Sequence, residues 1–156
     1  MSWELAQLNI AALLAPLDSP VLADFVAELD RINELADQAP GFVWRLRAED
    51  AEAAVDADIF GERVIVNISV WKTKDELHSY IYRTAHAQVM SRRKEWFERM
   101  SDASSVLWWV PEGHRPTTTE AKQRLERLKK EGPGFEAFTF KQSFLAPTEQ
   151  KRIQRT

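Results

Sequence analysis

The sequence of 156 residues contains no cysteine. Disulfide bonds, thiolate nucleophiles, iron–sulfur clusters and cysteine-based zinc sites are therefore excluded. Glycine is also scarce, with five residues, and there is no glycine-rich phosphate loop, no GxSxG elbow and no dinucleotide fingerprint. The sequence consequently gives no sign of a flavin, a nicotinamide or ATP, and we expect no cofactor of these kinds.

Long apolar runs and an excess of positive charge are missing as well. The longest uncharged stretch near the N-terminus, Leu5 to Leu17, has 13 residues, whereas a membrane-spanning helix needs about 20. No basic region precedes it, so we expect no signal peptide, no membrane contact and a cytoplasmic protein. The net charge of −3 argues against nucleic acid as the main partner, because such binders usually carry a dominant positive field.

What remains is typical of a folded globular protein. The chain is 44% hydrophobic and 29% charged, and it contains six tryptophans. A chain of this length can bury a single hydrophobic core. We therefore expect a single domain over residues 1–145, followed by a polar C-terminal tail over 146–156.

The first half of the chain predicts a strand, a helix and two further strands. Residues 3–10 and 41–47 predict strands, as do 63–71. Ser19-Pro20 marks a helix start, and the helix is expected to run to about Asp37. Its apolar residues recur at steps of three and four: Leu22, Phe25, Leu29, Ile32 and Leu35. The acidic residues 48–62 predict a long loop.

The second half predicts two helices and two strands. Thr73 and Glu76 have capping-box spacing and open a long helix, expected to reach about Met100. Residues 106–110 predict a strand, a second capping box at Thr117 and Glu120 opens a helix ending near Gly132, and 135–142 predict a last strand. The order is β-α-β-β-α-β with an added α-β, which predicts an α+β, ferredoxin-like fold.

The predicted strands carry bulky apolar groups on both faces. Trp108 and Trp109 are adjacent and so point to opposite sides of a sheet. In residues 64–71, one face is aliphatic, whereas the other carries Asn67, Ser69 and Trp71. An uncovered face with several tryptophans would exceed the apolar patch usual for a soluble monomer. We therefore expect a homodimer in which two sheets close into a dimeric α/β barrel, with the mixed face lining a cavity.

Four segments carry a resemblance that covers nearly the whole chain, from Trp3 to Phe144. They are INELADQAPGFVWRL (32–46), SVWKTKDELHSYIYRTAHAQVMSRRKEWF (69–97), LWWVPEGHRPTTTEAKQRLERLKKEGP (107–133) and FEAFTF. The chain resembles a bacterial family of domains of unknown function in the dimeric α/β-barrel superfamily, which also contains the antibiotic-biosynthesis monooxygenases. The resemblance implies a dimer with a cavity between sheet and helices. It implies no single chemistry, because the superfamily includes cofactor-free oxygenases, haem-dependent enzymes, isomerases and proteins without known activity.

His86 is the first candidate for a functional residue, expected in the middle of the 73–100 helix. A histidine there could be a general base or an axial haem ligand, or it could be a hydrogen-bonded core residue. Tyr82 and Arg93 follow the same helical stripe and would be supporting polar groups. A metal site is not expected, because His78 and His86 are separated by about 12 Å along a helix.

The tryptophans are the second set of candidates. Trp44, Trp96 and Trp108 could line a wide pocket for a flat molecule, or they could be core and interface. Asn67 and Trp71 are suspects for orienting a substrate, because the resemblance implies such roles in cofactor-free oxygenases. The leading hypothesis is a protein that binds a small aromatic or apolar molecule between sheet and helices, with cofactor-independent monooxygenase-like activity. The alternatives are haem binding through His86 and a non-catalytic dimer.

Overall fold

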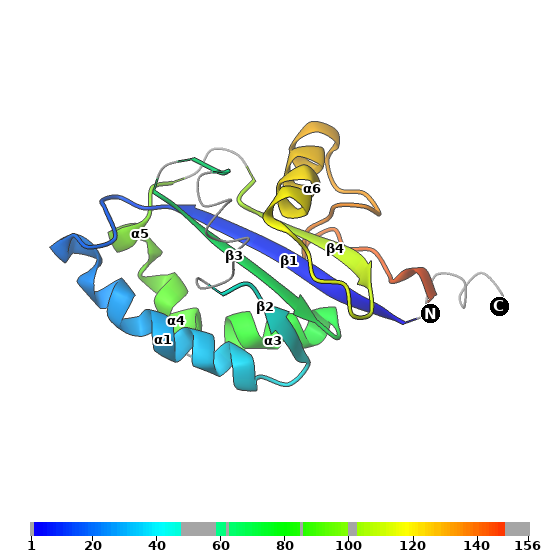
Figure 1. Cartoon of the computed structure of the whole chain (residues 1–156), viewed down its shortest axis with the longest axis horizontal. Helices are drawn as coiled ribbons and strands as arrows, with labels where there is room; N and C mark the ends of the chain where they lie inside the picture. The colour runs from blue at the N-terminus through cyan, green and yellow to red at the C-terminus, as the bar shows by residue number, and fades with distance from the viewer. Residues whose placement is uncertain (1, 48–58, 62, 85, 100–102, 149–156) are drawn as a thin grey trace.

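A four-stranded antiparallel sheet forms the centre of the molecule (Figure 1). The computed structural model describes residues 2–47, 59–61, 63–84, 86–99 and 103–148, so most of the predicted 48–62 loop lies outside the described residues. The strands are β1 (Trp3–Ala12), β2 (Phe42–Arg45), β3 (Val64–Trp71) and β4 (Ser105–Pro111). Their order is β2-β3-β1-β4. Because β3 separates β1 from β2, the arrangement is the split one expected of a ferredoxin-like α+β fold, which confirms that prediction.

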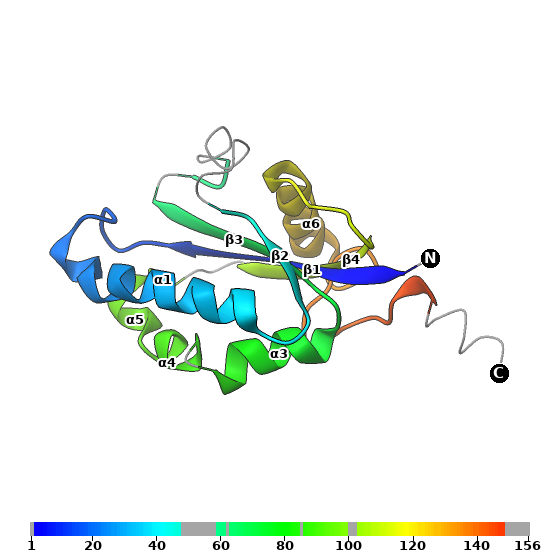
Figure 2. The ribbon, with the colours of Figure 1, turned by 60° about the horizontal axis from the view of Figure 1, so that its bottom comes forward.

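Helices cover both sides of this sheet (Figure 2). On one side lie α1 (Ala23–Gln38), preceded by the 3-10 turn η1 (Pro20–Leu22), and the successive short helices α3 (Lys74–Arg83), α4 (His86–Ser91) and α5 (Arg93–Trp96). On the other side lies α6 (Thr118–Glu131). Both predicted N-caps form, since Thr73 Oγ1 accepts from the backbone N–H of Glu76 and Thr117 Oγ1 accepts from that of Glu120, each at 3.1 Å.

The side of the sheet that packs against α1 and α3–α5 is called here the inner face. Residues opposite one another in the strand pairing share a face, which places Gln7, Asn67, Ser69 and Trp71 on it. Two apolar clusters join this face to the helices. The first cluster includes Leu5, Ala36, Trp71, Leu77, Tyr80, Leu107 and Phe138. The second includes Leu13, Leu22, Phe25 and Trp96, with Ile65 packed against it.

The outer face packs against α6. Ala121, Leu125 and Leu128 of this helix form one cluster with Ala6, Leu8, Ile10, Ile68, Val70, Val106, Trp108 and Val110 of the sheet. The chain's own helix therefore covers the half of the outer face nearest β4. Towards β2 and β3 the apolar residues Trp44, Phe60, Val64 and Val66 are only partly buried.

The continuous helix predicted over residues 73–100 is wrong, because two breaks divide it. At the first, Thr84 is extended, with φ −117° and ψ −175°. Its hydroxyl donates to the carbonyl of Tyr80 at 2.5 Å and accepts from the backbone N–H of His86 at 3.2 Å. At the second, Arg92 has φ −98° and ψ 8°. His86 consequently begins α4 instead of lying in mid-helix.

The last predicted strand, over residues 135–142, does not form. The backbones of Gly134 and Ala137 bond to each other in a tight turn, and Thr139 Oγ1 accepts from the backbone N–H of Gln142 in another. Only Phe138, between the two turns, pairs with β4, through a bridge to Leu107. The turns leave too few extended residues for a strand.

Within the described residues, no helix has the length and apolar character needed to cross a bilayer.

Candidate functional site

The centre of the inner face is polar, and its core is a hydrogen-bonded group of three side chains. Gln7 Nε2 donates to Asn67 Oδ1 at 2.9 Å and to Ser69 Oγ at 2.8 Å. On β1 and β3 the hydrophobic contacts of the inner face lie towards the two ends of the strands, with Leu5 and Trp71 at one end and Leu13 and Ile65 at the other, while Leu107 of β4 lies opposite Gln7. Gln7 and Ser69 are buried between them, whereas Asn67 is exposed. We call Gln7, Asn67 and Ser69 the polar patch.

A row of aromatic rings runs from the polar patch into the helical layer. Trp71 donates from Nε1 to Ser69 Oγ at 2.8 Å. The Trp71 ring stacks on Tyr80 with centroids 5.2 Å apart, and Tyr80 in turn contacts His86 at 5.1 Å. The hydroxyl of Tyr80 donates to the backbone carbonyl of Ile32 in α1 at 3.0 Å, which ties the ring to that helix. Of the three residues proposed from sequence as catalytic, Asn67 and Trp71 thus share the inner face, and His86 is connected to them through Tyr80.

His86 lies in an apolar environment at the start of α4. Burial lowers the pKa of its imidazole, while a backbone hydrogen bond with Ile81 opposes that shift. Its Nδ1 is fully buried and has no hydrogen-bond partner within the described part of the chain. A neutral imidazole with a spare nitrogen can accept a proton, so the ring is chemically suited to a base. The residue as a whole is half-buried, so it is the Nδ1 side of the ring that is separated from solvent.

A charged group lies beside the polar patch, at the β2 edge of the inner face. Arg45 is opposite Ser69 in the β2–β3 pairing, and its side chain is 16% exposed. It donates to Asp37 of α1 from Nε at 2.7 Å and from Nη2 at 3.3 Å. Arg47 also pairs with Asp37, at 3.6 Å. The Arg45 guanidinium holds the pKa of the Asp37 carboxyl below its usual value.

The remaining candidates lie away from the polar patch. Trp44 and Trp108 belong to the outer-face cluster, where Trp108 Nε1 donates to Glu120 Oε2 at 2.9 Å. Trp96 is buried near Phe25 in the second inner cluster. Two others are exposed on the helices, namely Tyr82, which contacts His78, and Arg93.

Arg45 and Tyr80 are not predicted as site residues from the sequence, and the side-chain contacts of Gln7 are not predicted either. Alternation along 3–10 places Gln7 on the same face as Leu5, but which residue it meets depends on pairing with a strand about sixty residues away. Arg45 follows a register shift between Phe42 and Trp44. Such a bulge changes which face the following residues occupy, so simple alternation along β2 could not assign either Trp44 or Arg45.

Comparison with known families and structures adds one firm assignment. A family model described as "Domain of unknown function (DUF3291)" matches residues 4–155. The chain belongs to this family. The resemblance to a family of unknown function is thereby confirmed. No curated protein matches the chain significantly.

Solved structures similar to this DUF3291 domain include a protein of unknown function and an oxygenase. The NE2512 protein of unknown function from Nitrosomonas europaea is 13% identical with a TM-score of 0.46, and the match covers 73% of this chain and 93% of that one. SnoaB, a cofactor-independent oxygenase from Streptomyces nogalater, is 18% identical with a TM-score of 0.44, covering 74% and 96%. Neither similarity is strong enough to support an inference about this chain.

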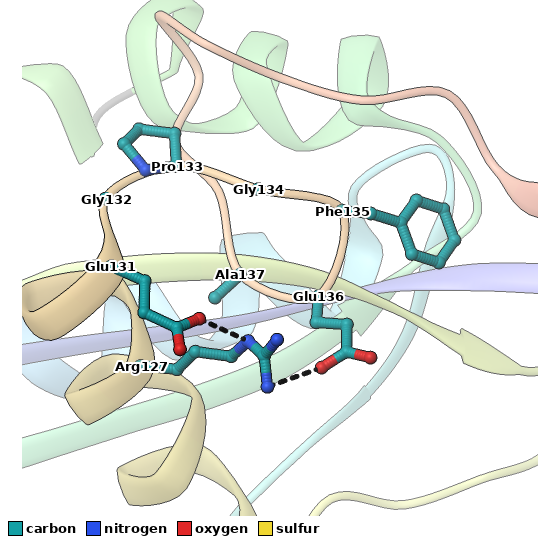
Figure 3. Close-up of a pocket in the computed structure, with 8 residues that line it drawn as sticks. All are labelled: Arg127, Glu131, Gly132, Pro133, Gly134, Phe135, Glu136 and Ala137. Carbon is teal, nitrogen blue, oxygen red and sulfur yellow. Dashed lines mark ion pairs between the residues drawn. The ribbon is translucent and has the colours of Figure 1, made fainter.

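Hollows open on the surface of the DUF3291 domain, and two that are formed by described residues are not lined by the polar patch. One, of about 300 Å³, lies where α6 ends, and Arg127 crosses it to pair with Glu131 at 3.3 Å and Glu136 at 2.8 Å (Figure 3). The other, of about 420 Å³, is lined by Lys74, Asp75, His78, Phe140 and Lys141. Among the described residues, no group of three or more His, Asp or Glu side chains could hold a metal ion.

Proposed function

We propose that this DUF3291 domain binds a small planar aromatic or apolar molecule against the inner face, beside Asn67, and oxidises it without a cofactor. The observation that carries the proposal is the placement of an exposed carboxamide within a hydrogen-bonded polar patch, on a face that is apolar towards both ends of its strands. Small-molecule sites are built in this way, with apolar walls and a few placed polar groups.

An electron-rich substrate can itself supply the electrons that reduce oxygen. In the simplest case a methylene group between two rings loses a proton to a base, and the resulting carbanion reacts with O₂. The methylene becomes a carbonyl with one oxygen atom, and its two hydrogens leave with the other as water. Asn67 would contact the substrate, with Trp71 and Tyr80 as the apolar wall beside it. His86, kept neutral by its environment, is the proposed base.

The proposed functional unit is a cytoplasmic homodimer. The apolar residues on the β2–β3 half of the outer face are only partly buried by α6 and its neighbours. The same half of a second copy offers matching apolar groups, and burial of each large aromatic ring would remove about 150–250 Å² from water. This pairing would leave the inner face free for its ligand.

Oxygen consumption with anthrone as a model substrate tests the proposal. Anthrone carries a reactive methylene between two rings, so enzyme-dependent oxygen uptake and anthraquinone formation are expected. Asn67→Ala should reduce the rate at least about tenfold, since a hydrogen bond to developing charge contributes roughly 1.5–3 kcal/mol. Asn33→Ala on α1 is the matched control and should leave the rate unchanged. Equal rates with and without protein, together with no quenching of tryptophan fluorescence by anthrone, would overturn the proposal.

Haem ligation by His86 has less support. The ring packs against Tyr80, and its Nδ1 is buried, so the surroundings of this nitrogen do not fit an iron atom without rearrangement. Haemin titration separates this alternative from the proposed oxygenase. A Soret shift that is lost in His86→Ala would favour haem and would replace the proposal above.

A further inference from the structure

We infer that the ligand of this site carries an anionic oxygen, such as a carboxylate, a phenolate or an enolate, and that Arg45, Ser69 and Asn67 hold that oxygen. The inference rests on the proposed function and adds to it the chemical class of the ligand. It comes from the direction of the hydrogen bonds on the inner face and from the placement of one cation beside them.

Ser69 is the first of the three groups. Its hydroxyl oxygen lies 2.8 Å from both Trp71 Nε1 and Gln7 Nε2. An indole N–H can only donate, so Ser69 accepts from Trp71, and it accepts from Gln7 as well. A hydroxyl has two acceptor positions and one proton. With both acceptor positions used, Ser69 has only its proton left to give, and no acceptor for it is found among the described residues.

The acceptor of the Asn67 side chain is also already occupied, which leaves its donors for a ligand. Its Oδ1 accepts from Gln7 Nε2 at 2.9 Å, which directs its NH₂ group away from Gln7. Asn67 is exposed on the inner face, so this group faces the space that a ligand would occupy. The carboxamide therefore presents donors there, as the hydroxyl of Ser69 does.

Arg45 supplies the charge. It is directly opposite Ser69 across the β2–β3 pair, where Cβ atoms are about 4.5–5.5 Å apart. Asp37 binds its guanidinium through Nε and Nη2, and Nη1 has no partner within the described residues. Arg47 also pairs with Asp37. Asp37 therefore leaves the Nη1 side of the Arg45 guanidinium available for a ligand, beside the donors of Ser69 and Asn67.

Donors from Ser69 and Asn67 beside a guanidinium on the same face favour a ligand oxygen that carries negative charge. The same arrangement fits the proposed reaction, because loss of a proton beside a carbonyl places the negative charge on the carbonyl oxygen. Recognition of a ligand carboxylate and stabilisation of an enolate would use the same atoms. A ligand bearing an N–H or a cation at this position would be repelled.

Binding of two probes of the same shape tests the inference. Naphthalene-carboxylate and naphthalene-carboxamide differ mainly in charge, and isothermal titration calorimetry gives the dissociation constant of each. The carboxylate should bind at least about tenfold more tightly, as a charged hydrogen bond contributes roughly 1.5–3 kcal/mol. Arg45→Gln should remove that preference while leaving carboxamide binding within about twofold of the wild type. Arg47→Gln, which removes the same charge from an exposed position nearby, is the matched control and should retain most of the preference.

A second variant guards against a loss caused by misfolding. Asp37→Asn removes the carboxylate that competes for Arg45, so carboxylate binding should become several-fold tighter, an effect that a damaged protein cannot produce. Equal affinity of the wild type for the two probes, or a preference that survives in Arg45→Gln, overturns the inference while the proposed function stands. Failure of both probes to bind overturns the inference and the proposed site together.

Discussion

The indole N–H of Trp71 bonds to the hydroxyl of Ser69 at 2.8 Å, although the two residues are only two positions apart on the same face of β3. This short-range bond orients an indole ring of the inner face that is only 1% exposed. It also joins the apolar wall to the polar patch, because Ser69 accepts from Gln7 as well. The position of the ring and the direction of the hydrogen bonds are therefore linked through one hydroxyl.

Ser69→Ala should destabilise the protein more than its size suggests. The substitution leaves the buried N–H of Trp71 without its acceptor, which costs about 1–3 kcal/mol in the free energy of unfolding. Urea denaturation monitored by tryptophan fluorescence measures the change. Ser91→Ala, at an exposed serine that donates to the carbonyl of Gln88, is the control and should change stability by less than about 0.5 kcal/mol. Equal effects of the two substitutions would contradict this account of the Trp71–Ser69 bond.

His86 should make the stability of the protein depend on pH in mildly acidic solution. Burial lowers the pKa of His86 in the folded state below its ordinary value of 6.5. The unfolded chain therefore binds a proton more readily in this range. The contribution of His86 to the free energy of unfolding is fully present above about pH 6.5, and it declines as the pH falls from there towards the folded pKa.

Urea midpoints measured from pH 7.5 down to about pH 5 test this. His86→Phe keeps a ring against Tyr80 but cannot be protonated, so its midpoint should fall less over this range than that of the wild type. His78→Gln, at an exposed histidine, should behave like the wild type. A wild-type curve parallel to that of His86→Phe would show that the buried imidazole does not titrate as expected.

Tyr80 should give the opposite dependence in alkaline solution. Burial raises its pKa to about 12 from the ordinary 10.0. The contribution of Tyr80 to the free energy of unfolding is therefore fully present below about pH 10. It is lost as the pH rises towards 12, because the phenol ionises first in the unfolded chain. Tyr80→Phe should abolish this loss, while at pH 8 it should cost about 0.5–1.5 kcal/mol through the missing bond to the Ile32 carbonyl. Tyr82→Phe, at the other tyrosine, should leave the alkaline transition in place.

The fold was largely predictable because its signals are local. Alternation and helical spacing give the element order, and the N-caps at Thr73 and Thr117 form where the sequence places them. The break after α3 was not predictable in the same way. A threonine within a helical pattern does not by itself predict a break. At Thr84 the hydroxyl replaces helical hydrogen bonds with bonds to the carbonyl of Tyr80 and the N–H of His86.

The candidate site was predictable only in part, because it depends on which residues pair across strands. Alternation places Asn67, Ser69 and Trp71 on one face, as observed. Arg45 could not be found, since its position opposite Ser69 follows from a bulge in β2. The same bulge separates Trp44 from the face occupied by Phe42. The position of Gln7 opposite Ser69 depends on the register of the whole β1–β3 pairing.

The proposed dimer can be tested on the half of the outer face that α6 leaves partly uncovered. Val66 lies there on β3, opposite Ile10 in the pairing, and it is partly buried. If two copies meet through this surface, Val66→Asp places a charge in an apolar interface, where it has neither water nor a partner. Analytical ultracentrifugation at micromolar concentration should then show a dimer for the wild type and a monomer for Val66→Asp.

The control for this experiment is a valine that lies on a helix instead of the sheet. Val26 of α1 is 40% exposed, so Val26→Asp should leave the dimer intact. Circular dichroism must show that Val66→Asp is folded, because a charge beside Ile10 could also destabilise the monomer. A folded Val66→Asp that remains dimeric would move the interface elsewhere, and a monomeric wild type would mean that α6 alone is sufficient to cover the outer face.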